Sequence, residues 1–281
     1  MPELPEVETV KNGLIPVLKN QIISDIKLYR SDLRIPFTKG IEQHLKNKKI
    51  IGLERRAKYI ICDIEGPRYL VIHLGMTGSF ESYPRNEKYN HQLHDHFVLT
   101  LKNGTKLAYN DPRRFGMVFS LEKKEWERSQ YFHHLGLEPL SSEFTAEYLH
   151  SKLSGKIVSI KQAIMDQRVV VGVGNIYASE ALYLSKINPK IKAGKISLKR
   201  LKNLVENIRL VLKKSIEAGG STLKDYKKVD GGMGYFQHQF YVYDKEGEIC
   251  ILCKKAGEMS PCIKRIVQSG RSTFYCTRLQ K

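Results

Sequence analysis

Four of the five cysteines lie near the end of the chain, and their clustering indicates a metal site. Cys250 and Cys253 form a C-x2-C pair, and Cys262 and Cys276 follow. In an intracellular chain such a cluster indicates metal binding before disulfide formation. A zinc ribbon normally repeats the C-x2-C pair, but the position that would complete a second pair is Leu279. An all-cysteine site with Cys262 as the odd ligand is one interpretation, and a metal-free β-hairpin with free thiols is the other.

The glycine-rich segment VVGVGNIYASE at 170–180 could bind phosphate. Gly172 and Gly174 allow close backbone approach, and Asn175 is a good helix N-cap. The N–H groups exposed at a helix start bind phosphate well. The glycine spacing is not that of a Rossmann fold, and the preceding residues read as helix. We therefore predict a phosphate-binding turn between two helices, with a plain helix-turn-helix connection as the alternative.

The segment DPRRFG at 111–116 carries side chains suited to a nucleic acid. A guanidinium such as that of Arg113 can bond base edges, and an exposed Phe115 could wedge between bases. Met76 in HLGMTGS is a second candidate probe. The alternatives are structural roles: Phe115 could be buried with both arginines solvated, and Met76 could fill the core. Lys58, in RRAKYI, reads on its own as part of a solvated basic face.

The first ten residues, MPELPEVETV, are unusual for a protein terminus. Pro2 and Glu3 follow the start methionine, and Pro5 and Glu6 come shortly after. Closely spaced proline and glutamate make a poor strand and a poor helix interior. A disordered terminus is the common explanation, and the composition alone does not decide between disorder and function.

The charge balance points to a polyanionic partner. The 281 residues include 47 Lys and Arg against 29 Asp and Glu, so the net charge is +18. An excess of this size favours nucleic acid over an anionic membrane, because we find no long basic amphipathic helix with aromatic anchors. The longest apolar runs are too short to span a bilayer, and no secretory signal is visible. We expect a soluble, intracellular protein.

The periodicity of the chain predicts an α+β fold in which these segments are positioned. Apolar spacing predicts a helix over 5–20, which Pro16 could kink or shorten. Residues 50–120 predict a β-sandwich or barrel, with Cys62 in a buried strand. After a linker at 136–144, apolar spacing predicts helices over 145–154, 159–167, 175–186 and 197–217. The alternation in FQHQFYVYD at 236–244 predicts a strand.

Together, these motifs closely resemble the bacterial formamidopyrimidine-DNA glycosylase family, whose members are also called 8-oxoguanine DNA glycosylases. The resemblance covers essentially the whole chain and rests on segments that occur in the family order: MPELPEVETV, HLGMTGS, DPRRFG, MDQ-x4-GVGNIYASEAL, GGSTLKDY, GYFQHQFYVYDKEGE and GRSTFYC. Leu4 separates the chain from the sister endonuclease VIII family, which usually carries glycine there.

The resemblance implies an N-terminal β-sandwich with a leading helix, a helical helix-two-turn-helix module and a zinc-ribbon-like β-hairpin. The implied boundaries are a catalytic domain at 1–135, a linker at 136–148, a DNA-binding domain with a lesion-recognition loop at 149–238, and the hairpin at 239–281.

The resemblance also implies covalent catalysis by the terminus. The start methionine is removed, and the secondary amine of Pro2 becomes the nucleophile. A terminal amine has a pKa low enough to be partly neutral near pH 7. Its attack on the sugar C1′ expels the damaged base, and the resulting iminium drives β- and then δ-elimination of the flanking phosphates. The implied product is a one-nucleotide gap bounded by phosphates.

Further site residues follow from the same resemblance. The implied proton donors are Glu3 to the opening sugar ring, Lys58 for β-elimination and Arg271 for δ-elimination. The loop from Ser221 to Gly234, with Glu6, Thr222 and Tyr235, would close over the everted base. Three implied DNA contacts fill the hole left by the flipped nucleotide: Met76, Arg113 and Phe115, with Arg113 facing the orphaned cytosine. Two further residues, Lys161 and Asn175, are implied to contact phosphates. His94 is implied to contact the DNA backbone.

The finger departs from the family pattern C-x2-C-x16-C-x2-C. Counting back from Cys276 by that spacing reaches Met259, and the final cysteine is replaced by Leu279. The segment therefore has an insertion and at least one lost family ligand. We expect one Zn²⁺ per chain, held by the four remaining cysteines of the cluster.

The function expected from these features is excision of oxidised purines (8-oxoguanine and formamidopyrimidines) from duplex DNA, followed by cleavage of the abasic site. The partner is duplex DNA that carries such a lesion or an abasic site. We expect a monomer in the bacterial cytoplasm. Three alternatives are an enzyme for oxidised pyrimidines, a non-catalytic lesion-binding protein, and a zinc-ribbon transcription or RNA-binding factor, which would leave MPELPEVETV unexplained.

Overall fold

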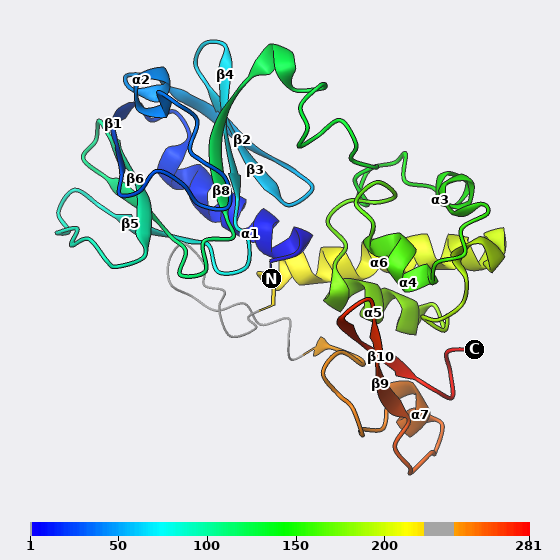
Figure 1. The fold of residues 1–281 in the computed structure, drawn as a ribbon. Coiled ribbons are helices and arrows are strands. Elements are labelled where there is room, and N and C mark those ends of the chain that lie inside the picture. Colours follow the sequence, from blue (N-terminus) through cyan, green and yellow to red (C-terminus); the bar gives the residue numbers. More distant parts are fainter. Residues whose placement is uncertain (1, 222–238) are drawn as a thin grey trace. The chain divides into compact units, whose positions relative to one another are not determined.

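The computed structural model describes residues 2–221 and 239–281, and these form two compact units (Figure 1). One unit comprises residues 2–133 with 216–221, and the other comprises 134–215 with 239–281. The first is built on β-sheets and the second mainly on helices, so the predicted α+β class is confirmed.

The first unit is a sandwich of two four-stranded antiparallel sheets. In each sheet, apolar side chains from the inner face enter one shared core, as the alternation of the sequence predicts. One sheet has the order β1 (Ile23–Leu28), β6 (Asp95–Leu101), β7 (Lys106–Asn110), β5 (Ser79–Tyr83). The other has the order β2 (Ile50–Arg56), β3 (Tyr59–Ile64), β4 (Arg68–His73), β8 (Met117–Glu122). Cys62 is fully buried in β3, as predicted.

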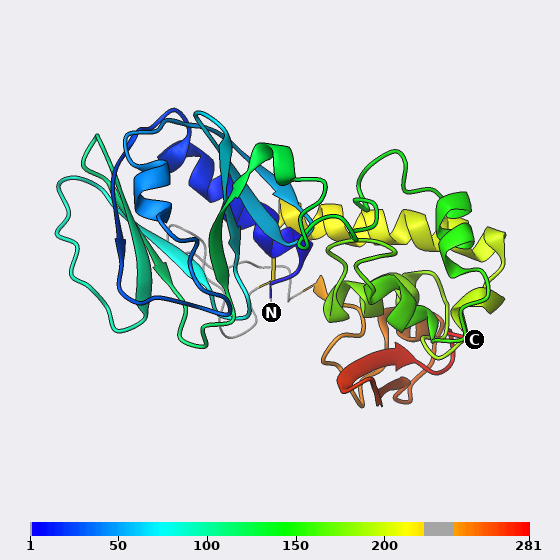
Figure 2. The ribbon, with the colours of Figure 1, turned by 45° about the horizontal axis from the view of Figure 1, so that its top comes forward.

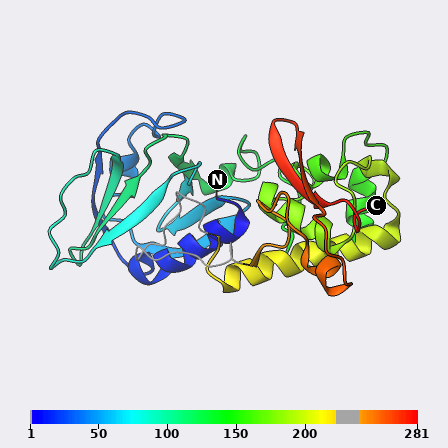
Figure 3. The same ribbon diagram turned by 90° about the horizontal axis from the view of Figure 1, so that it is seen from below.

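Helix α1 (Leu4–Leu18) opens this unit and packs on β2 and β3 (Figure 3). Val7, Val10 and Leu14 recur at helical spacing and are at most 1% exposed. Pro5 lies in the first turn, where a missing N–H costs nothing. Pro16 lies inside the last turn without ending the helix, so the predicted 5–20 span is nearly correct. The short elements α2 (Ile41–Leu45) and η1 (Lys123–Glu125) complete the unit.

The helices of the second unit lie close to the predicted spans. They are α3 (Ala146–Leu153), α4 (Ile160–Met165), α5 (Asn175–Leu184), the 3-10 turn η2 (Ala193–Lys195) and the 20-residue α6 (Leu198–Glu217), seen in yellow in Figure 2. Thr145 caps α3 and Ser159 caps α4 through their side chains. The last residues of the linker expected at 136–148 therefore belong to α3.

The chain ends in a small hairpin module. Strands β9 (Ile263–Gln268) and β10 (Arg271–Cys276) pair antiparallel, and the short helix α7 (Ile251–Lys255) precedes them. Strand β10 packs on α5. The module's own apolar core is small: Val242, Ile263 and Phe274, with the four clustered cysteines and Tyr183 of α5.

The strand predicted over 236–244 is wrong for its described part, because residues 239–244 form turns. The buried carboxylate of Glu180, on α5, accepts hydrogen bonds from the backbone N–H groups of Tyr241, Val242 and Tyr243 at 2.7, 3.0 and 2.8 Å. These consecutive donors converge on one side chain, so the segment curls around it instead of extending into a ladder. Residues 236–238 lie outside the described part of the chain.

No helix in the described ranges is long and apolar enough to cross a membrane.

Candidate functional site

The N-terminal segment is ordered and buried, so the explanation by disorder is wrong. Pro2 is buried, and Glu3 and Glu6 are 3% and 2% exposed. Glu3 and Glu6 form a capping box at the start of α1, in which the Glu3 N–H donates to Glu6 Oε2 at 2.9 Å. The same Glu6 carboxylate reaches Ser221, whose N–H and hydroxyl both donate to Oε1 at 2.9 Å.

Glu6 therefore holds the residue at which the predicted lesion loop begins. Gly220, directly before it, has φ +81°, a conformation that favours glycine. The loop residues Thr222 and Tyr235 lie outside the described residues.

Lys58 sits in the turn between β2 and β3 and is 8% exposed, so it is not part of a solvated face. Arg55 fixes this turn to α1. Its Nε donates to Glu8 Oε2 at 2.7 Å, and its Nη1 donates to the carbonyl oxygen of Ala57 at 2.9 Å. Ala57 has φ +54°, a left-handed conformation that needs support in a non-glycine residue. The helix that carries Glu3 thus holds the turn that carries Lys58.

Two neighbouring loops of the first unit carry the predicted DNA probes. The N–H of Arg113 donates to Thr77 Oγ1 at 3.2 Å, which joins the loop of Met76 to that of Phe115. The Arg113 guanidinium lies over the Phe115 ring at 5.0 Å. Phe115 is 45% exposed, so its alternative placement in the core is wrong. The backbone carbonyl of His94 accepts from the N–H of Asp111, at the start of the same loop.

His73, at the end of β4, supports the Met76 loop as a neutral ring. Its Nδ1 accepts the N–H of Gly75 at 3.0 Å. Burial, with the nearby charges of Lys58 and Arg34, lowers the pKa of His73 to about 4 from an ordinary value of 6.5. The ring therefore stays neutral at physiological pH.

We expect this histidine to make stability depend on pH between 6.5 and 4. An unfolded histidine takes up a proton below its ordinary pKa, whereas the folded ring does so only near the lowered value. The stabilisation is therefore complete above pH 6.5 and is lost as the pH falls toward 4, by up to about 3 kcal/mol. His73→Asn keeps an acceptor for the Gly75 N–H but does not titrate.

Urea unfolding at stepped pH should give a flatter profile for His73→Asn than for the natural chain. The exposed His150→Asn is the control and should follow the natural profile. Parallel slopes for the natural chain and His73→Asn would contradict the assignment.

A cavity of about 260 Å³ in the second unit brings three predicted residues together. Its lining comprises Lys161, Gln162, Met165, Asp166, Asn175, Gln268, Ser269 and Arg271. Arg271 is exposed at the start of β10, whereas Lys161 is 1% exposed. The Lys161 ammonium donates to Asn175 Oδ1 at 2.6 Å, Thr273 Oγ1 at 2.8 Å and the carbonyl of Ser272 at 3.1 Å.

Lys161 thus links α4, the start of α5 and β10, and it orients the side chain of Asn175. The N-cap of α5 is Gly174, and Asn175 is the first helical residue, so the predicted cap is one residue off. The Asn175 side chain instead accepts from Lys161 through Oδ1 and donates from Nδ2 to the hydroxyl of Tyr243 at 3.3 Å.

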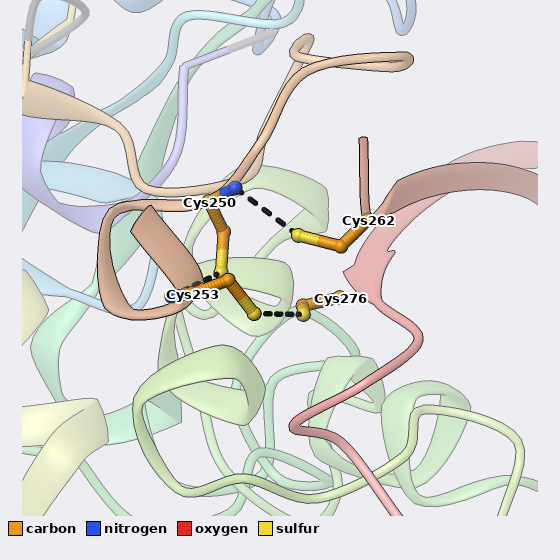
Figure 4. Close-up of side chains that lie close together, drawn as sticks. All are labelled: Cys250, Cys253, Cys262 and Cys276. Atoms are coloured by element: carbon orange, nitrogen blue, oxygen red, sulfur yellow. Dashed lines mark hydrogen bonds between the residues drawn. The ribbon is translucent and has the colours of Figure 1, made fainter. Parts of the chain in front are cut away.

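The four clustered cysteines come together as a ligand set (Figure 4). Their sulfur atoms all lie within 4.8 Å of one another, and Cys253 Sγ is 3.7 Å from Cys276 Sγ. Tetrahedral zinc with Zn–S bonds of about 2.3 Å places its sulfurs about 3.8 Å apart. The N–H groups of Cys250 and Cys253 point at the sulfurs of Cys262 and Cys250. The donor set, chemistry and spacing therefore fit a metal ion.

The loss of the family's last cysteine still leaves four clustered sulfurs. Leu279 packs, half-buried, against the apolar core of the hairpin module. Cys262, directly before β9, supplies the fourth sulfur.

Some residues that build the site stand in the quoted motifs, but nothing in the sequence indicated their roles. Glu8, Arg55, Thr77 and Glu180 are common residue types, and each contacts partners that lie far away along the chain. Their positions follow only from the fold. Asp111 begins the motif DPRRFG, in which only the arginines and the phenylalanine have side chains of types that predict a DNA contact.

Two family models and a curated relative match this chain. Residues 1–118 match the family model of the formamidopyrimidine-DNA glycosylase N-terminal domain, and residues 135–227 match that of the formamidopyrimidine-DNA glycosylase H2TH domain. The formamidopyrimidine-DNA glycosylase of Dinoroseobacter shibae is 44% identical over 288 residues, covering 100% of both chains.

Two solved structures are similar over their full length. A mutant Lactococcus lactis FPG in complex with a Fapy-dG containing DNA has a TM-score of 0.89 and 30% identity, covering 100% of both chains. MutM in complex with carbocyclic 8-oxo-G containing DNA has a TM-score of 0.88, with the same identity and coverage.

The fold and the matched domains are those of a DNA glycosylase with an H2TH domain. The chain belongs to the formamidopyrimidine-DNA glycosylase family.

Proposed function

We propose that this enzyme excises oxidised purines from duplex DNA and then cleaves the abasic site. The observation that carries the proposal is the buried and hydrogen-bonded N-terminal segment. Pro2 and Glu3 are buried there, and the Glu6 carboxylate accepts hydrogen bonds from the N–H groups of Glu3 and Ser221. The substrate class is supported by the Fapy-dG and 8-oxo-G DNA bound to the similar proteins. We assign catalysis to residues 1–135, DNA binding to 149–238 and phosphate contact to the hairpin at 239–281.

In this proposal, removal of the start methionine frees the secondary amine of Pro2. The amine nitrogen forms a bond to C1′ and gives up its N–H proton, while the glycosidic bond breaks with its electron pair leaving on the base, which takes up that proton. Glu3 gives a proton to the ring oxygen as the sugar opens. The product is an iminium with no N–H proton to lose, so it stays a cationic electron sink. Loss of a C2′ proton then releases the 3′ phosphate, and a second elimination releases the 5′ phosphate.

Lys58 and Arg271 supply protons to these eliminations. Lys58 is suited to this role because its turn is fixed to α1 through Arg55 and Glu8. Arg271 is exposed and lines the cavity with Asn175, so one phosphate could contact both. An arginine presents several N–H donors to a phosphate at once.

The remaining contacts hold the distorted duplex. Met76, Arg113 and Phe115 enter the space left by the flipped nucleotide, with Arg113 facing the orphaned cytosine. His94 contacts the sugar-phosphate backbone. Asn175 contacts phosphate directly, while Lys161 contributes its positive charge and holds Asn175 in place.

The metal in this proposal is one zinc ion held by Cys250, Cys253, Cys262 and Cys276. Zinc there supplies structural cross-linking and no step of the reaction. It would fix α7 against the start of β9 and the end of β10.

The experiment that tests the proposal is borohydride trapping on a duplex with 8-oxoguanine opposite cytosine. We expect a covalent adduct that maps to Pro2, and strand cleavage that leaves phosphates at both ends of the gap. The matched controls are an undamaged duplex and a chain whose start methionine is retained, and neither should give an adduct. No adduct with the damaged duplex, despite tight binding, would leave a lesion-binding protein instead.

A further inference from the structure

The structure assigns a positioning role to Asp111, which locks the loop of Met76 to the loop of Arg113 and Phe115. These three side chains then act as one rigid unit, and this unit fixes the preference for cytosine as the base opposite the lesion. This inference rests on the proposed function of those three side chains. Asp111 itself is 0% exposed and cannot contact DNA directly, so it acts through its neighbours.

The two oxygens of the Asp111 carboxylate are shared between the loops. Oδ1 accepts the hydroxyl of Thr77, which follows Met76 in the first loop. Oδ2 accepts the N–H of Gly116 at 2.8 Å, at the end of the second loop. Because each oxygen serves a different loop, the carboxylate sets their relative register.

Thr77 passes this constraint directly to the arginine. Its hydroxyl donates to Asp111, and its oxygen accepts the N–H of Arg113 at 3.2 Å. The backbone carbonyl of Asp111 also accepts the N–H of Arg114 at 3.1 Å, and Arg114 has φ +57°. A non-glycine residue in this left-handed region persists where its surroundings hold it.

The loops also touch backbone to backbone, with no room for slippage. A Cβ built on Gly75 would lie 2.3 Å from the carbonyl carbon of Phe115. One built on Gly116 would lie 1.9 Å from the hydroxyl oxygen of Tyr109 and 2.9 Å from Asp111 Oδ2. The absence of side chains at both glycines therefore lets the Asp111 contacts form.

A rigid unit favours one base opposite the lesion, because the guanidinium of Arg113 can hydrogen-bond to the edge of that base only from a fixed position. Loss of the Thr77 hydroxyl frees the backbone of Arg113 and leaves one Asp111 oxygen without its donor. We expect the preference for cytosine over adenine opposite the lesion site to fall about tenfold, within the range of one good side-chain contact to a base.

The test is equilibrium binding of the full chain to duplexes with a tetrahydrofuran abasic analogue opposite cytosine or adenine. This readout does not require the enzyme to react, so it is separate from the trapping experiment. Thr77→Val should lose most of the preference for cytosine, and Thr77→Ser, which keeps the hydroxyl, should retain it. Asp111→Asn should behave like Thr77→Val, and thermal unfolding identifies a variant that has failed to fold.

A natural preference retained in Thr77→Val would overturn the inference. Equal binding of the natural chain to both duplexes would also overturn it, because no preference would then exist to be fixed. A uniform loss of affinity in Thr77→Val, with the cytosine-to-adenine ratio unchanged, would show a structural role only and would also overturn it.

Discussion

Glu3→Gln should lower the single-turnover rate of 8-oxoguanine excision by about a hundredfold to ten-thousandfold, the usual contribution of general acid catalysis. The same variant should cleave a preformed abasic site at a rate much closer to that of the natural chain. An abasic sugar opens to its aldehyde without enzyme, so Pro2 can form the iminium there with less need for a proton from residue 3. The two substrates therefore separate a proton donor from a residue that merely holds the terminus.

The fold should tolerate this substitution. A glutamine has nearly the same shape, and its amide oxygen can still accept an N–H in the capping box at the start of α1. Glu6 and its bonds to Ser221 are unchanged. The matched control is Glu54→Gln, on an exposed position of β2 in the same unit. It should excise and cleave at natural rates. An equal, large loss on both substrates for Glu3→Gln would contradict the proton-donor role.

Removing the metal should lower the affinity for a lesion duplex by two or more powers of ten. An isolated two-stranded hairpin is only marginally stable in water, and β9 and β10 have only a small apolar core of their own. Structural zinc contributes about 10–16 kcal/mol to small zinc-binding peptides. Without it, Arg271 would lose its position, and Lys161 would lose its acceptors Ser272 and Thr273.

Elemental analysis and binding titrations check this prediction. The natural chain should carry one zinc per molecule, and Cys253→Ser and Cys262→Ser should each release it. Cys62→Ala removes the cysteine outside the cluster and should keep both the metal and the affinity. Cys262→Ser combined with Leu279→Cys asks whether the family's usual position can restore the site. A zinc content near zero in folded, active protein would refute the metal assignment.

The elements that the sequence revealed are those in which local patterning and long-range packing agree. The apolar spacing of Val7, Val10 and Leu14 predicted α1, and the buried face of that helix is the one that packs on the sheet. Strand β1 was missed because its burial does not alternate along the chain. The strand predicted over 236–244 failed because Glu180, some sixty residues earlier, captures three of its N–H groups. No local pattern reports such a distant acceptor.

The site was predicted largely through family resemblance, and it is least predictable where this chain departs from the family. The spacing rule suggested a lost ligand at Leu279, but folding brings Cys262 into the cluster from a different position. The family spacing alone does not place Cys262, but the number of cysteines in the cluster predicted it as the odd ligand, and the structure brings the four sulfurs together. Likewise, Lys161 matched a phosphate contact, yet its burial and three protein acceptors make it a link between elements.

The burial of Cys62 in β3 has a consequence for the survival of the enzyme under oxidative attack. Burial raises the pKa of the Cys62 thiol to about 12, so only about one molecule in 10⁵ carries the reactive thiolate at neutral pH. The other four cysteines are buried as well. Peroxide reacts with accessible thiolates, and the first unit, which carries the proposed nucleophile, presents none in its described part. The thiol of this unit would thus stay reduced in the presence of peroxide.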